Sequence, residues 1–246
     1  MSFIFISPPF GNYFPEFFFN KTILCDKEYK IKSIVGSFTI NKRSGLLLQI
    51  MKTLRYSNEY NGWVNKIGLR NPGIEWAIDK YYKKSDIITS VAIINRADIK
   101  QLDDLIPKDM NIEVNVSCPN VKKGDDLYSE IRCFLNSERD WCIVKLPPTI
   151  NLSDIDKLYA DGWRQYHCCN TLPVKEGGLS GKSIKPYTDK LTNYISETYP
   201  NTIIISGGGI HDYNDLCSYK EKGANHFSVS TLLFNPIKFI YLLTNL

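Results

Sequence analysis

The stretch Ile112–Asn120 reads IEVNVSCPN and joins a short apolar run to a group of polar residues. Its first part, Ile112–Val116, has the β-branched character and the length of a buried strand. The polar group Ser117–Asn120 follows directly and places a thiol, Cys118, just past the end of that strand. Because ligands in α/β folds bind at the carboxyl ends of strands, we expect this stretch to lie in a binding site.

Seven further apolar runs are similar in length to Ile112–Val116 and alternate with helix-like segments. This alternation favours a parallel sheet with crossover helices. Several runs are apolar at consecutive positions, as strands covered on both faces tend to be. A closed barrel and an open doubly wound sheet both satisfy the pattern. The seven runs are Phe3–Ile6, Ser33–Val35, Ile87–Ile93, Trp141–Leu146, Trp163–Cys169, Thr202–Ile205 and His226–Val229.

The composition indicates one soluble domain. The chain has 246 residues, 43% of them hydrophobic, a size at which a barrel forms a single domain, here residues 1–246. The net charge of +4 comes from 30 basic and 26 acidic residues without a run of like charges, so we expect no nucleic-acid partner. No apolar stretch approaches the roughly 20 residues of a membrane span, and no signal peptide is recognisable. We therefore expect no membrane association and a cytoplasmic location.

The seven cysteines are irregularly spaced. An odd number without an export signal indicates reduced thiols in a cytosolic compartment. His167 stands beside Cys168 and Cys169, but adjacent strand residues point to opposite faces, and no second ligand pair follows at zinc spacing. We expect no metal site.

Two glycine clusters fit a phosphate site. Gly207–Gly209 follow one apolar run, and Ser230 and Thr231 follow the next, so backbone N–H groups and hydroxyls can meet an anion there. The second cluster, Gly177–Gly181, adds another loop to hold the same phosphate. Each cluster also has a plainer interpretation, a strand-to-helix turn for the first and a flexible surface loop for the second.

Two polar side chains interrupt apolar runs. Asn115 lies within Ile112–Val116, where a buried carboxamide needs a ligand or a backbone group as its partner. Lys145 lies within Trp141–Leu146, where a charge needs an anionic or electron-rich partner. A salt bridge to a carboxylate elsewhere in the chain also explains Lys145, and a thiol such as that of Cys118 is often a small apolar side chain without chemistry.

Taken together, these motifs resemble those of the dihydroorotate dehydrogenases, soluble members of which also carry a cysteine at the position of Cys118. The order and spacing of the motifs match from about Ser7 to Thr231. The resemblance implies a (β/α)8 TIM barrel. The matching segments are Asn65–Gly73 (NKIGLRNPG), Glu113–Asn120 (EVNVSCPN), Val144–Leu146 (VKL), Gly177–Gly181 (GGLSG), Ser206–Ile210 and the pair Gly223 and Ala224.

The resemblance implies FMN-dependent oxidation of dihydroorotate to orotate in de novo pyrimidine biosynthesis. Cys118 would be the base that removes a proton from C5 while C6 passes a hydride to N5 of FMN. The implied substrate-binding residues are Asn65, Gly68, Leu69, Asn115, Asn120, Asn170 and Thr171. The implied cofactor-binding residues are Ser7, Ser37, Asn115, Lys145, Gly181, Gly208, Gly209, Ser230 and Thr231.

Some positions depart from the family pattern. Gly36 stands where the family has a lysine that contacts flavin and substrate, so activity is weak or absent unless Lys42 or Arg43 reaches the site. Pro8 removes a backbone N–H close to the expected flavin. The chain also lacks parts that often shape the dimer surface, so the oligomeric state does not carry over.

Two other functions stay open. Gly36 favours a relative that keeps the barrel, with or without FMN, and acts by binding. A flavin enzyme acting on another pyrimidine, such as dihydrouridine synthase, has a similar cysteine motif, but the absence of a basic patch counts against it. The expected small-molecule partner is dihydroorotate or orotate. The stretch Asn120–Gly124 is most similar to forms that pass electrons to a partner subunit, with a homodimer as the other arrangement and the electron acceptor open.

Overall fold

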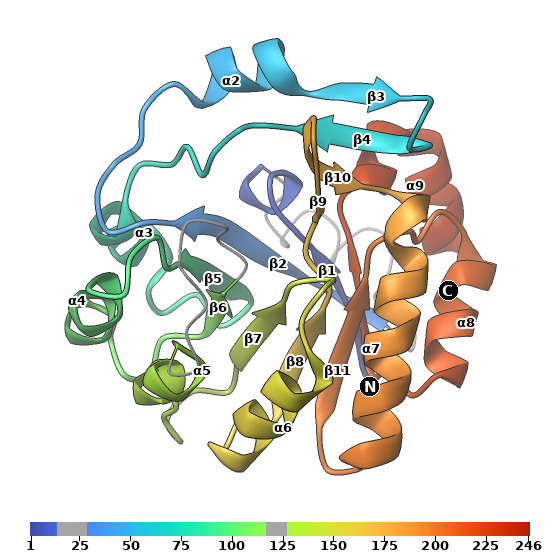
Figure 1. Ribbon diagram of the computed structural model, residues 1–246. Helices are drawn as coiled ribbons and strands as arrows, with labels where there is room; N and C mark the ends of the chain where they lie inside the picture. The colour runs from blue at the N-terminus through green and yellow to red at the C-terminus, as the bar shows by residue number, and fades with distance from the viewer. Residues whose placement is uncertain (14–28, 117–126) are drawn as a thin grey trace.

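Eight parallel strands close into a barrel in the computed structural model, which describes residues 1–13, 29–116 and 127–246 (Figure 1). The order around the barrel is β1, β12, β11, β8, β7, β6, β5, β2. Every predicted apolar run forms one of these strands, and the predicted (β/α)8 barrel is confirmed. The strands are β1 (Ser2–Ile6), β2 (Tyr29–Phe38), β5 (Ile87–Ala92), β6 (Ile112–Asn115), β7 (Cys142–Leu146), β8 (Gln165–Cys168), β11 (Ile203–Gly207) and β12 (His226–Val229).

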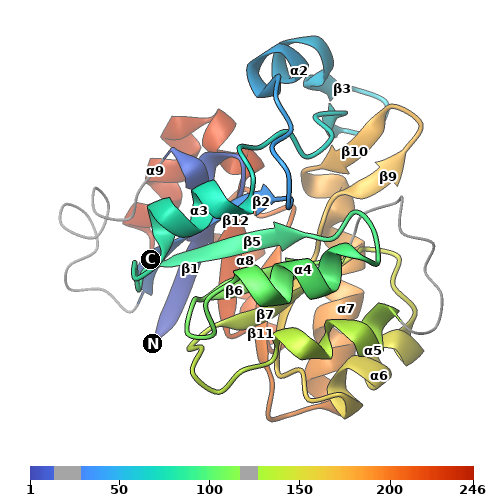
Figure 2. The same ribbon diagram turned by 90° about the vertical axis from the view of Figure 1, so that its left-hand side faces the viewer.

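Helices fill the connections and cover the outside of the barrel (Figures 1 and 2). Side chains cap the starts of α8 and α9: Asp212 accepts a hydrogen bond from the Asp215 N–H, and Asn235 accepts one from the Lys238 N–H. The helices are α2 (Leu46–Thr53), α3 (Ile74–Tyr81), α4 (Asp98–Leu105), α5 (Leu127–Glu130), α6 (Leu152–Ala160), α7 (Lys185–Thr198), α8 (Tyr213–Glu221) and α9 (Pro236–Thr244), with 3-10 turns η1 (Phe10–Asn12), η2 (Ile131–Phe134), η3 (Lys182–Ile184) and η4 (Thr231–Phe234).

Strand β7 shows how alternate side chains serve the two faces of the barrel wall. All five of its residues are buried. Val144 and Leu146 pack in the large cluster between barrel and helices, whereas Ile143 packs with Phe5 and Ile205 in a separate cluster inside the barrel. This period of two places Lys145 on the same inner face as Ile143.

Strand β2 begins four residues before its predicted run, Ser33–Val35. The prediction was too short because two lysines precede the run and interrupt its apolar pattern. Lys32 is buried, with its ammonium 3.2 Å from Asp86 Oδ1 and 3.2 Å from the Ser85 carbonyl. These partners outside the strand allow a charged residue within a barrel strand, an arrangement that the local apolar pattern does not indicate.

A second, four-stranded sheet lies across one end of the barrel and was not predicted. Its order is β3 (Arg55–Ser57), β4 (Gly62–Asn65), β10 (Gly177–Ser180) and β9 (Leu172–Val174). Figures 1 and 2 place it with α2 at the end of the barrel opposite the N-terminus, where the strands have their carboxyl ends. The second glycine cluster is therefore a strand in a sheet and not a flexible loop. An added Cβ at Gly177 would lie 2.2 Å from the Asn65 carbonyl oxygen, so glycine allows β10 to approach β4.

No helix within the described ranges is both long enough and apolar enough to cross a membrane.

Candidate active site

A cavity of about 290 Å³ opens at the carboxyl end of the barrel. Barrel strands supply its floor, the small sheet supplies Trp63, Asn65 and Ser180, and helix α2 supplies Ile50. Its volume is near the lower end of the range of small-molecule sites, and most of its lining is apolar, as such sites usually are. Because the cavity lies at the carboxyl ends of the strands, its position is the one where barrel enzymes build their active sites.

Behind Lys145 and His167, which line the floor of the cavity, lies a buried carboxylate, Glu113, with no solvent exposure. Its Oε1 accepts a hydrogen bond from Ser90 Oγ at 2.7 Å and lies 3.6 Å from Lys145 Nζ, while its Oε2 lies 2.5 Å from His167 Nδ1. Burial alone would raise the pKa of Glu113, but the charge of Lys145 and the contacts with His167 and Ser90 bring it down to about 2. Glu113 is therefore ionised at neutral pH.

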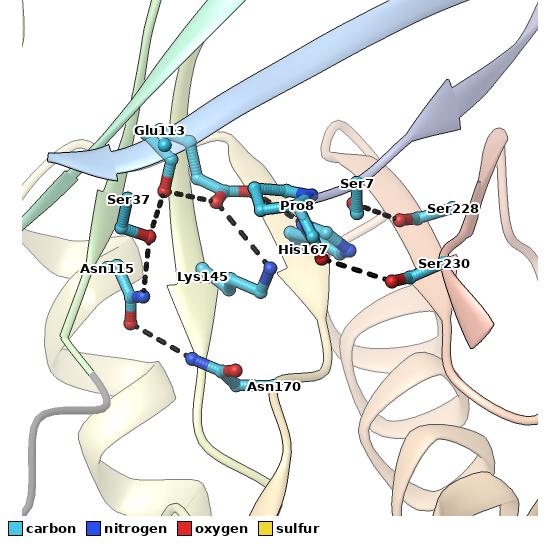
Figure 3. A network of polar contacts seen from close by, with 12 residues as sticks. Ser7, Pro8, Ser37, Glu113, Asn115, Lys145, His167, Asn170, Ser228 and Ser230 are labelled. Atoms are coloured by element: carbon cyan, nitrogen blue, oxygen red, sulfur yellow. Dashed lines mark hydrogen bonds and ion pairs between the residues drawn. The ribbon is translucent and has the colours of Figure 1, made fainter. Parts of the chain in front are cut away.

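A directed chain of hydrogen bonds runs from Glu113 to the carboxamides at the strand ends (Figure 3). Since the Ser90 hydroxyl donates to Glu113, its oxygen accepts from the Ser37 hydroxyl at 2.8 Å. The Ser37 oxygen in turn accepts from Asn115 Nδ2 at 3.0 Å. Asn115 Oδ1 accepts from Asn170 Nδ2 at 3.0 Å. The buried charge thus fixes the orientation of both asparagines.

A second group of polar contacts, called the serine seam here, joins the first and last barrel strands and the residues that follow them. Ser7 Oγ and Ser228 Oγ are 2.6 Å apart, and Ser230 Oγ donates to the Pro8 carbonyl at 3.0 Å. Ser7, Ser228 and Ser230 also line the cavity. Figure 3 shows this seam on the opposite side of Lys145 and His167 from the asparagines.

The segments after β11 and β12 form an anion cradle. Gly208 and Gly209 have φ of +87° and +80°, backbone angles that residues other than glycine rarely adopt. Among the described residues, none accepts a hydrogen bond from the backbone N–H of Gly208, Gly209 or Thr231. Gly209 is buried, so its N–H group requires a partner from a ligand or water. A phosphate monoester supplies such acceptors, and the cradle fits the phosphate of a nucleotide cofactor.

The walls between floor and cradle are flat and apolar. Trp63 and Phe234 stack with ring centroids 4.3 Å apart, and Phe10 meets Phe234 edge-on at 5.0 Å. All three rings line the cavity, together with Ile50 and Leu54. Such walls suit a planar aromatic ring system, so the residues present fit a flavin mononucleotide.

The structure brings most of the predicted site residues together around this cavity. Ser37 and Asn115 do not line it but are linked to Asn170 by the hydrogen-bond chain. Gly68 and Leu69 lie outside the lining, beside Ile67, which belongs to it. Cys118 and Asn120 fall outside the described residues. The predicted residues that line the cavity are Ser7, Asn65, Lys145, Asn170, Thr171, Gly181, Gly208, Gly209, Ser230 and Thr231.

Gly36 has no space for the lysine that the family pattern places there. Its φ is +111°, and an added Cβ would lie 2.6 Å from the Ser90 carbonyl oxygen. Neither Lys42 nor Arg43 lines the cavity, and Arg43 Nε donates instead to the Gly68 carbonyl at 3.3 Å. Lys145 is the only lysine or arginine among the described lining residues.

Glu113, His167 and Ser90 are not among the site residues predicted from the sequence. An ion pair between Lys145 and a carboxylate elsewhere in the chain was one of the two explanations left open for this lysine, and the structure shows such a pair with Glu113. A signal was available, because Glu113 and Asn115 are two residues apart on one strand and therefore share a face. Like Asn115, Glu113 is a polar residue in a buried strand and needs a partner there.

Fold and cavity together define a (β/α)8 barrel with a cavity at the carboxyl ends of its strands, the position of the active site in barrel enzymes. The family model of dihydroorotate dehydrogenase matches residues 18–161, which are 144 of the 246 residues. The chain therefore belongs to the dihydroorotate dehydrogenase family, a family of oxidoreductases, and the resemblance found in the sequence is confirmed.

Curated relatives agree with this assignment. The catalytic subunit of dihydroorotate dehydrogenase B (NAD(+)) from Staphylococcus carnosus is 30% identical over 225 residues, covering 76% of this chain and 73% of the relative. The subunit of the same name from Malacoplasma penetrans is 30% identical over 241 residues, covering 82% and 75%. The crystal structure of Eimeria tenella DHODH in complex with ferulenol covers 86% of this chain and 73% of its own, with a TM-score of 0.65 and 17% identity. That similarity supports the fold alone.

Proposed function

We propose that this protein oxidises dihydroorotate to orotate with FMN as its cofactor, a step of de novo pyrimidine biosynthesis. The proposal depends on one observation: a single cavity has backbone N–H groups for a phosphate on one side and polar side chains for a substrate on the other. At one side the glycines after β11 offer free backbone N–H groups to a phosphate. At the other, Asn170 and Thr171 line the cavity beside the ion pair of Lys145 and Glu113.

The chain offers a binding position for each part of FMN. Gly181, Gly208, Gly209, Ser230 and Thr231 would hold the phosphate, with the buried N–H of Gly209 as a strong donor. Lys145, Ser7 and Ser37 would contact the ring system. When bound, FMN accepts a hydride at N5, which is the oxidising chemistry that the side chains lack.

The substrate would lie between the ring system and the strand-end carboxamides. Asn65, Asn115, Asn120 and Asn170 would pair with its amide groups and carboxylate, with Thr171 beside them and Gly68 and Leu69 closing over them. Asn115 and Asn170 are already oriented by their own hydrogen bonds, so little ordering of these groups is needed on binding. Water exclusion by Trp63 and Phe234 would favour proton removal from a carbon acid.

Cys118 would act as the base that takes the proton from C5 of dihydroorotate. In the sequence it follows Asn115, the last residue of β6, by three positions. An unperturbed thiol has a pKa of about 8.5, so the reaction rate should rise with pH as the thiolate forms.

Replacement of this thiol tests its role. Cys118→Ala should abolish flavin reduction by dihydroorotate while leaving bound flavin in place, because the base is lost but the cavity is kept. The matched control is Cys133→Ala, since Cys133 is a free, exposed thiol away from the cavity and should leave the reduction rate unchanged. Rapid-mixing absorbance without oxygen gives both rates. A Cys118→Ala protein that is reduced as fast as the wild type would refute the role of Cys118.

Gly36 favours a second function, flavin binding without dihydroorotate oxidation. The family lysine cannot occupy this backbone position, and Lys145 shares its charge with Glu113. In this alternative the purified protein holds flavin but is not reduced by dihydroorotate.

The names of the relatives suggest how electrons leave the site. Both are catalytic subunits of an NAD(+)-linked enzyme, a description that implies a partner subunit for those proteins. For this chain we propose an electron-transfer subunit as the partner, with a homodimer as the other arrangement, and a cytoplasmic location.

A further inference from the structure

One residue at the cavity floor has no part in the proposed reaction, although its position is tightly determined. His167 is 1% exposed, and its Nδ1 lies 2.5 Å from Glu113 Oε2. In the barrel register it pairs directly with Lys145, the residue that shares the same carboxylate. Both residues line the cavity. Two neighbouring strands thus present an ammonium and an imidazole side by side.

The contact with Glu113 determines which nitrogen of His167 carries the proton. A carboxylate can only accept hydrogen bonds, so His167 Nδ1 must donate to it. Burial and the charge of Lys145 lower the pKa of His167 against the opposing pull of Glu113. The imidazole is therefore neutral at neutral pH. Its Nε2 then carries a lone pair and acts as an acceptor.

The surroundings keep this acceptor available to a ligand. No described residue forms a hydrogen bond with His167 Nε2, although the side chain is almost completely buried. An added Cβ at Gly207 would lie 3.1 Å from Nε2 and 2.8 Å from Ser228 Cβ. The glycine therefore leaves open the space next to Nε2. His167 lines the cavity, so a donor group of a bound ligand can reach this acceptor.

We infer that Lys145 and His167 form a donor and acceptor pair that recognises an adjacent C=O and N–H on the edge of a bound ring. Lys145 donates to the carbonyl oxygen, and His167 Nε2 accepts from the ring N–H. Glu113 is the positioning residue that fixes both. The inference rests on the proposed function, because FMN then supplies this edge through its C2 carbonyl and its N3–H group.

A purely structural role for His167 gives a different expectation. If the only role of His167 is its hydrogen bond to Glu113, its Nε2 contacts no ligand atom. Removing the N–H group from the ring edge then does not affect binding. A flavin methylated at N3 separates the two cases, since 3-methyl-FMN lacks the donor but keeps the phosphate, the carbonyl groups and the ring.

The binding test compares FMN with 3-methyl-FMN on the wild-type holoprotein after removal and replacement of its flavin, with fluorescence quenching as the readout. Wild type should prefer FMN by about tenfold or more. His167→Leu should bind FMN about tenfold to a hundredfold more weakly and lose the preference. His226→Leu, which changes a buried histidine at the other end of the barrel, should keep both the affinity and the preference.

Nitrogen NMR of the wild-type protein tests the hydrogen bond without any substitution. With 15N-labelled histidine, His167 should show a protonated Nδ1 and an unprotonated Nε2, and the Nε2 resonance should shift upfield when FMN binds but not when 3-methyl-FMN binds. A protonated Nε2, or equal affinity of wild type for the two flavins, would overturn the inference. If wild type binds neither flavin, the proposed function itself fails, and that outcome is distinct from wild type binding both flavins equally.

Discussion

The two ends of the barrel interior are filled by opposite chemistry, although each contains a buried histidine. At the amino end, Trp141 meets Phe3, Phe5 and His226 edge-on, with ring centroids 5.4 to 5.7 Å apart. At the carboxyl end, His167 meets a carboxylate and lies beside Lys145. The amino end is therefore closed by packed aromatic rings, whereas the carboxyl end presents polar groups to a cavity, a division common in barrel enzymes.

The largest expected effect comes from removing the aromatic centre of the amino end. Trp141→Ala leaves a cavity among Phe3, Phe5 and His226, and should lower the free energy of unfolding by about 3 to 5 kcal/mol. Urea denaturation followed by circular dichroism measures the loss. The affinity of the folded protein for FMN should stay within about twofold of wild type, because the site lies at the other end. A loss of FMN affinity as large as the loss of stability would break the division between the two ends.

A smaller effect follows from protonation of His226 at the amino end. Burial lowers the pKa of His226 to about 4, below the ordinary value of 6.5. Between these values the unfolded chain binds a proton that the folded chain does not, so stability should fall as pH decreases from 6.5 to 4. The contribution of His226 is on the order of 2 kcal/mol, and it is fully present above pH 6.5.

Paired unfolding curves at several pH values isolate this contribution. In His226→Gln the decrease between pH 6.5 and 4 should be smaller than in wild type, while the remaining decrease reflects other groups. An unchanged pH dependence in this variant would show that His226 is protonated as easily in the folded protein as in the unfolded chain.

The smallest effect concerns the anion cradle at the carboxyl end. Gly209→Ala places a Cβ 3.0 Å from Lys185 Cβ at a φ of +80°, so the backbone must shift and its N–H must move from the phosphate position. FMN affinity should fall about tenfold, whereas the affinity for riboflavin, which lacks the phosphate, should change much less.

The control for this change is Gly45→Ala. Gly45 has a φ of +90° but no atom within 4 Å of an added Cβ, so the substitution introduces backbone strain away from the cavity. Fluorescence titration should show unchanged FMN affinity for this variant. Equal losses for FMN and riboflavin in Gly209→Ala would contradict the assignment of a phosphate cradle.

The sequence indicated the barrel strands because each one is a local pattern. Runs such as Ile203–Ile205 are apolar at consecutive positions, and the neighbours Ile204 and Ile205, which point to opposite faces, are both buried. The glycines after β11 and the carboxamide of Asn115 were also recognisable, since each is unusual at the end of a buried strand. These signals need no knowledge of distant partners.

The features that sequence reasoning missed depend on contacts between distant segments. Glu113 joins β6 to residues of β5, β7 and β8, and no spacing within one segment reveals that arrangement. The small sheet pairs β4 with β10, more than 100 residues later in the chain, through a close approach at Gly177. The local sequence pattern was therefore enough to predict the strands. The contacts beneath the cavity could be recognised only in the folded structure.

The most direct test of the central claim is the visible spectrum of the purified protein before and after dihydroorotate is added without oxygen. Oxidised flavin absorbs at about 450 nm, a property of the cofactor itself. A dihydroorotate dehydrogenase should show this band and lose it on addition of dihydroorotate. A flavin band that dihydroorotate leaves unchanged would contradict oxidation of this substrate and favour the binding function.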